Sequence, residues 1–152
     1  MYARRGLAVA GLALLLACQD SAGPTPTPEL SLAQLAGTWD LSAFKLLLES
    51  DTTVQLDLKA ALDLTATLAI TTGGASILTV QFPNEVPDTV EGTIVLQGDT
   101  LVYSGPSSTL EYRIAVTGRR MTWFALYTDE FADLDGDGSA DETRETYGWV
   151  RR

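Results

Sequence analysis

Apolar and polar residues alternate along much of the chain, which predicts β-strands that bury one face. The clearest alternating segments are residues 54–58, 64–70, 78–82, 90–96, 110–116 and 121–127. A continuous apolar run at Leu46-Leu47-Leu48 predicts a further strand that is buried on both faces. Each segment has the length of an ordinary strand in a globular protein.

Turn-forming residues separate these segments. They include Gly73-Gly74, Pro83-Asn84, Gly98-Asp99 and Gly118. Short strands with such spacing predict an all-β domain, either a small antiparallel barrel of about eight strands or a β-sandwich. Helical signals are confined to residues 31–35, where Ser31 and Gln34 have capping-box spacing, and to residues 59–64.

The start of the predicted domain resembles the lipocalins and related calycin-type barrels. These proteins open with a short helical turn and a Gly-x-Trp motif, which Gly37 and Trp39 match here. The resemblance implies that Trp39 plugs one end of the barrel and that an arginine of the last strand, Arg151 or Arg152, packs over its ring. Such a cation–π contact is worth about 0.5–2 kcal/mol. The disulfides of that family have no counterpart in this chain.

The first residues have the parts of an export signal. Arg4 and Arg5 precede an apolar run over residues 6–17, which is too short to span a bilayer. The run ends in Leu15-Leu16-Ala17-Cys18 and resembles the lipobox of bacterial lipoproteins. That resemblance implies a lipid on Cys18 that anchors the mature protein to a membrane. Gln19 directly after the cysteine favours the outer membrane, facing the periplasm or the cell surface.

These signals divide the chain into three parts: a signal peptide over residues 1–17, a lipidated cysteine with a Pro/Thr-rich tether over 18–29, and one β-domain over 30–152. Cys18 is the only cysteine, so the domain has no internal disulfide. The domain is expected to be a monomer.

Composition excludes several kinds of function. The chain has no histidine, which excludes Ser-His and Cys-His catalysis and the usual zinc and copper sites. Its net charge of -10 disfavours nucleic acids and anionic lipid headgroups as partners. We therefore expect a protein that is not an enzyme.

An acidic loop near the carboxyl end is the sharpest chemical motif. Its candidate calcium ligands are Asp133, Asp135, Asp137, Ser139, Asp141 and Glu142. The first three match positions one, three and five of an EF-hand loop, but Arg144 stands where that loop needs glutamate. The segment instead resembles the Asp-rich calcium loops of dockerins and thrombospondin type-3 repeats, placed on a β-hairpin. The alternative is a solvated Asp-Gly turn.

Two functions remain open from the sequence. The first is a non-catalytic envelope lipoprotein whose barrel binds a small apolar ligand, with calcium as a structural ion. The second is a β-sandwich interaction module that binds an envelope protein or a glycan through its surface. An open apolar cavity would favour the first, and a filled core with an exposed aromatic patch would favour the second.

Overall fold

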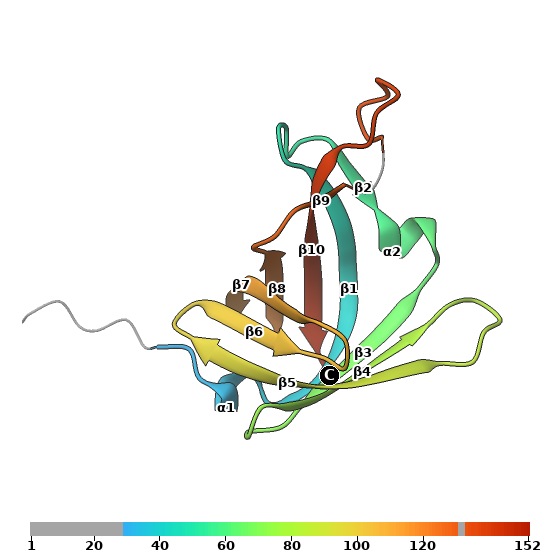
Figure 1. Cartoon of the computed structure of the whole chain (residues 1–152). Helices are drawn as coiled ribbons and strands as arrows, with labels where there is room; N and C mark the ends of the chain where they lie inside the picture. The colour runs from blue at the N-terminus through green and yellow to red at the C-terminus, as the bar shows by residue number, and fades with distance from the viewer. Residues whose placement is uncertain (1–28, 131–132) are drawn as a thin grey trace, which may run out of the picture.

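A computed structural model describes residues 29–130 and 133–152 of the protein (Figure 1). The helices and strands are α1 (Leu32–Leu35), β1 (Gly37–Leu48), β2 (Gln55–Asp57), α2 (Leu58–Ala61), β3 (Thr65–Ile70), β4 (Ala75–Gln81), β5 (Asp88–Gln97), β6 (Thr100–Ser104), β7 (Thr109–Thr117), β8 (Arg120–Ala125), β9 (Asp129–Glu130) and β10 (Glu142–Arg151). The signal peptide, Cys18 and all but the last residue of the tether lie outside the described residues.

The strands form one closed antiparallel barrel. β1 pairs with β3, neighbouring strands pair in sequence from β3 to β8, β8 pairs with β10, and β10 returns to pair with β1. These eight strands leave no free edge, whereas β2 and β9 are short additions beside β1 and β10. The closed pairing confirms the all-β barrel of about eight strands and excludes the β-sandwich alternative.

Every second side chain of a strand faces the inside of the barrel. In β3 and the residue before it, Leu64, Ala66, Leu68 and Ile70 are all buried, and the residues between them are exposed or half-buried. The prediction for residues 46–48 was only partly right, because Leu46 and Leu48 are buried but Leu47 is half-buried.

The alternation over residues 54–58 is also interrupted. β2 ends at Asp57, and Leu58 is the first residue of α2. The Asp57 carboxylate accepts a hydrogen bond from the Ala60 backbone N–H (3.0 Å), which caps the helix at its amino end. Because this cap starts the helix at Leu58, the strand ends at Asp57, although Leu56 and Leu58 are spaced as in a strand.

One end of the barrel is closed by α1 and Trp39. The Gln34 side chain accepts a hydrogen bond from the Ser31 backbone N–H (2.8 Å), so the predicted capping box starts this one-turn helix. Trp39 is fully buried and its indole N–H donates to the Leu35 carbonyl (2.8 Å). In Figure 1, α1 lies at one end of the barrel and the acidic loop before β10 projects at the other.

Candidate ligand-binding cavity

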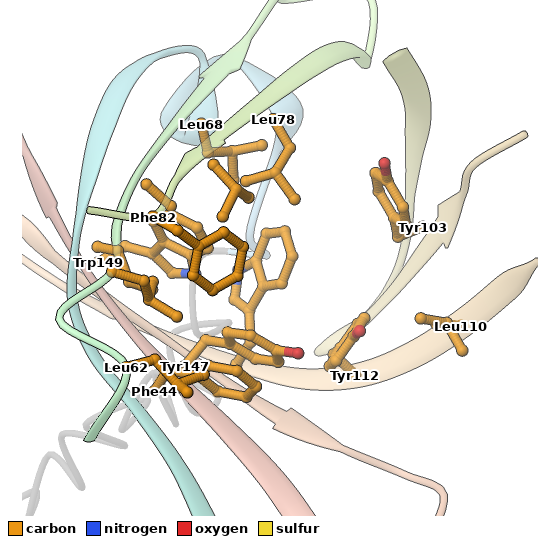
Figure 2. Close-up of a pocket in the computed structure, with 15 residues that line it drawn as sticks. Phe44, Leu62, Leu68, Leu78, Phe82, Tyr103, Leu110, Tyr112, Tyr147 and Trp149 are labelled. Carbon is orange, nitrogen blue, oxygen red and sulfur yellow. The ribbon is translucent and has the colours of Figure 1, made fainter. Parts of the chain in front are cut away.

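The barrel encloses an apolar cavity of about 290 Å³ between the Trp39 end and the opposite rim (Figure 2). A volume of this size is at the lower limit for small-molecule pockets. Its wall consists of aliphatic and aromatic side chains: Leu41, Phe44, Leu62, Leu64, Ala66, Leu68, Leu78, Val80, Phe82, Tyr103, Leu110, Tyr112, Trp123, Tyr147 and Trp149. Leu62 and Phe82 are partly exposed, 45% and 37%, so the cavity reaches the surface at its rim.

One wall is a ladder of near-parallel rings from β1 and β10. The strand register places Phe44 opposite Tyr147, and their rings stack at a centroid distance of 4.6 Å and an interplanar angle of 9°. Tyr147 in turn lies parallel to Trp149, 6.4 Å away at 14°. The three rings thus pack their faces against one another, an arrangement that aromatic pairs favour.

Tyr103 contributes to the facing wall, and a glycine makes room for it. A Cβ atom on Gly92 would lie 2.7 Å from the Tyr103 ring, so the ring packs over the bare backbone of β5. Burial raises the pKa of the Tyr103 hydroxyl, which has no hydrogen-bond partner among residues 29–130 and 133–152. Figure 2 shows Tyr103, Leu110 and Tyr112 across the cavity from the Phe44 and Trp149 side.

A polar network adjoins the aromatic wall. The Tyr147 and Tyr127 hydroxyls both donate to Oε2 of Glu145, at 2.7 and 2.6 Å, and the Tyr112 hydroxyl lies 3.3 Å from that of Tyr127. Desolvation, followed by the Glu145 charge or hydrogen bond, raises the pKa of Tyr127 and Tyr147 well above the ordinary value. Burial raises the pKa of Tyr112 to about 12. These hydroxyls are therefore protonated donors at neutral pH.

The residues of the Gly-x-Trp motif lie at the closed end of the barrel. The Arg151 guanidinium lies 4.5 Å from the centroid of the Trp39 ring and donates a hydrogen bond to the Gln34 carbonyl. Gly37 has a φ of 134°, a conformation that side chains disfavour, and its backbone lies close to Arg151. Of the two arginines that the resemblance offered, Arg152 instead pairs with Asp40 at the surface (2.7 Å).

The acidic loop lies apart from the cavity. Carboxylate oxygens of Asp133, Asp135 and Asp141 come within 4.8 Å of one another. Asp137 and Glu142 do not belong to this group of carboxylates. Glu142 is the first residue of β10, where it pairs with Glu130.

Backbone N–H groups of the loop hold these carboxylates in place. Asp133 accepts from Gly136 (2.6 Å) and Gly138 (2.9 Å), and Asp141 accepts from Leu134 (2.6 Å) and Asp135 (3.2 Å). These hydrogen bonds offset part of the mutual repulsion of the side chains. The loop is thus a folded turn in which three of the five predicted carboxylate ligands converge.

Glu145 is a candidate site residue that the sequence analysis missed. It alternates with Thr143, Tyr147 and Trp149, which are buried or half-buried, so it shares their inward face of β10. This alternation was the available signal, but residues 143–149 are not among the alternating segments that the sequence analysis identified. The structure starts β10 at Glu142.

Comparisons with known proteins do not place the chain in a family. No protein-family model matches it, and no curated protein is similar to it. One solved structure with some similarity is described as EF1p2_mFAP2b bound to DFHBI. It is 18% identical, with 80% of this chain and 97% of that chain aligned at a TM-score of 0.41.

Within the described ranges, no helix is long and apolar enough to cross a membrane.

Proposed function

We propose that this protein is a non-catalytic lipoprotein of the bacterial envelope that holds a small apolar ligand inside its barrel. The observation that carries the proposal is the cavity of about 290 Å³, whose wall is almost wholly apolar. Water finds few hydrogen-bond partners on such a wall. A ligand that buries apolar surface there is stabilised by about 25 cal/mol for each Å². The partly exposed Leu62 and Phe82 at the rim mark the route of entry.

Dye binding tests this proposal. Full-length protein in phosphatidylcholine nanodiscs is titrated with N-phenyl-1-naphthylamine, an uncharged apolar dye, and empty nanodiscs supply the blank. We expect saturable fluorescence from the wild type and loss of that signal in Leu78→Trp, which fills the cavity from β4. Ile77→Trp is the matched control, because Ile77 is exposed on the outside of the same strand. Equal signals from the two variants would place the dye outside the barrel and refute the proposal.

Anchoring through Cys18 is the second part of the proposal, supported by the lipobox sequence at residues 15–18. Two or more acyl chains give stable attachment to a bilayer. In a bacterial host fed radiolabelled palmitate, the protein should carry label and fractionate with outer membranes. Cys18→Ala should carry none, and label on that variant would contradict the proposal.

We further propose that the acidic loop binds calcium as a structural ion. The convergence of Asp133, Asp135 and Asp141 supports it, since calcium takes six to eight oxygen ligands. Three carboxylates are an incomplete shell, so we expect a Kd of about 10⁻⁴–10⁻³ M. Isothermal titration calorimetry should detect the heat of calcium binding in the wild type and not in Asp135→Asn. A wild-type titration that matches the buffer blank would contradict the proposal.

A further inference from the structure

Glu145 is an inward-facing carboxylate whose charge the apolar cavity does not explain. Neutral apolar ligands need no anion at the wall, and a half-buried charge costs free energy unless it is paired. Among the described residues, the ion pairs are Arg113–Asp99, Arg144–Glu49 and Arg152–Asp40, so Glu145 has no cationic partner there.

The two tyrosines beside Glu145 leave one of its oxygens free. Tyr127 and Tyr147 both donate to Oε2, and no described residue donates to Oε1. A carboxylate accepts about four hydrogen bonds, so this network fixes the group in position without saturating it. Tyr147 also belongs to the cavity wall, and Glu145 is the next inward-facing residue of β10, so its carboxylate adjoins the cavity at the Tyr147 hydroxyl.

The surroundings of Glu145 favour positive charge. Phe44, Tyr112 and Trp123 flank Tyr147, with ring centroids 4.6, 5.9 and 6.4 Å from its own. Tyr147, which holds the carboxylate, therefore lies within an aromatic cluster, an environment that attracts cations. The chain carries a net charge of -10, and the acidic loop that precedes β10 projects at the end of the barrel opposite α1 (Figure 1). The resulting potential steers cations toward this end and repels anions.

We propose that the ligand is an organic amine with an apolar body, whose ammonium group binds Glu145 while its body fills the cavity. This inference rests on the proposed function and narrows it to one ligand class. An ammonium has three donors and no acceptor, so it matches the free Oε1 of Glu145. A fatty acid or another carboxylate would instead meet a like charge.

A charge series of naphthalenes tests the ligand class. 1-Naphthylmethylamine, 1-methylnaphthalene and 1-naphthylacetate share the flat body and are cationic, neutral and anionic at pH 7. Each is titrated as a competitor of the dye bound to full-length protein in phosphatidylcholine nanodiscs, corrected for partition into empty nanodiscs. We expect the cation to displace the dye at a concentration at least tenfold below the neutral compound, as a charge-assisted hydrogen bond implies, and the anion to be the weakest.

Two variants assign that preference to its residue. Glu145→Gln keeps the shape and an acceptor but removes the charge, so the ratio of cation to neutral affinity should fall to about one. Glu91→Gln removes an equal charge from an exposed position on β5 and should keep the wild-type ratio. Raising the salt concentration should lower the ratio in the wild type only slightly, because a half-buried pair is weakly screened.

The outcomes separate the two proposals. If the dye binds but the neutral or anionic naphthalene competes best in the wild type, the amine proposal is wrong and the apolar cavity stands. An unchanged ratio in Glu145→Gln would also overturn it, since the preference would then arise elsewhere. If the dye itself does not bind inside the barrel, the proposed function fails first.

Discussion

Replacing Arg151 with methionine should destabilise the folded barrel by an amount that can be worked out from the contacts of its side chain. The substitution keeps an apolar stem over Trp39 but removes the guanidinium that lies 4.5 Å from its ring centroid. For a half-buried pair the cation–π contact is worth about 1 kcal/mol, between the exposed and desolvated limits. The charged hydrogen bond to the Gln34 carbonyl adds about 1.5 kcal/mol.

One contribution acts in the opposite direction. Nε of Arg151 is buried without a partner among the described residues, so its removal relieves about 1 kcal/mol. The net loss is about 1.5 kcal/mol, which for a domain of this size lowers Tm by roughly 5–9 °C. Circular dichroism at 218 nm during heating measures this shift. Arg152→Met is the control, because its ion pair with Asp40 is exposed and should contribute little. Equal shifts in both variants would refute the role assigned to Arg151.

Three further substitutions or conditions should have measurable effects. Gly74→Ala should lower the free energy of unfolding in urea by about 2–4 kcal/mol, since Gly74 has a φ of 87° and a Cβ there would lie 2.3 Å from the Ile94 carbonyl oxygen; a loss below about 1 kcal/mol would contradict this. Gly92→Ala should push the Tyr103 ring toward the cavity and weaken dye binding several-fold with the barrel still folded, whereas unchanged dye affinity would show that the ring moves elsewhere. The raised pKa of Tyr112, about 12 against an ordinary 10.0, favours the protonated hydroxyl in the folded state, so its stabilising effect is complete below pH 10 and is lost as the pH rises toward 12. Urea midpoints measured from pH 8 to 12 should fall above pH 10 and less steeply in Tyr112→Phe.

The barrel itself could be predicted because its signal is local. Strands that bury one face must alternate, and the residues from Leu64 to Ile70 do so without interruption. The closed end was also recognisable, because Gly37 and Trp39 stand in a fixed local motif. Neither prediction needs knowledge of which strands are neighbours.

The cavity could not be predicted in this way. Leu78 and Val80 follow the same alternation whether they meet a filled core or an empty space, since the pattern records only which side a residue faces. Whether the interior is full depends on distances across the barrel. Those distances follow from strand tilt and register, for which single-sequence patterns contain no information.

The site at Glu145 depended on register as well. The pairing of β10 with β1 places it opposite Leu46 within a strand. The arrangement of the loop carboxylates likewise depends on the path of the backbone. Spacing identifies which carboxylates are close along the chain, but the backbone turns at Gly136 and Gly138 decide which of them converge.

The pairing of β1 with β10 has a consequence for the biogenesis of the protein. The salt bridge between Asp40 and Arg152 joins positions 112 residues apart, and the whole seam between the two strands has a similar separation. Such a barrel cannot close until β10 has been synthesised, and its high contact order slows this final step. Folding of the barrel is therefore expected to follow the synthesis of β1 to β8 and not to accompany it.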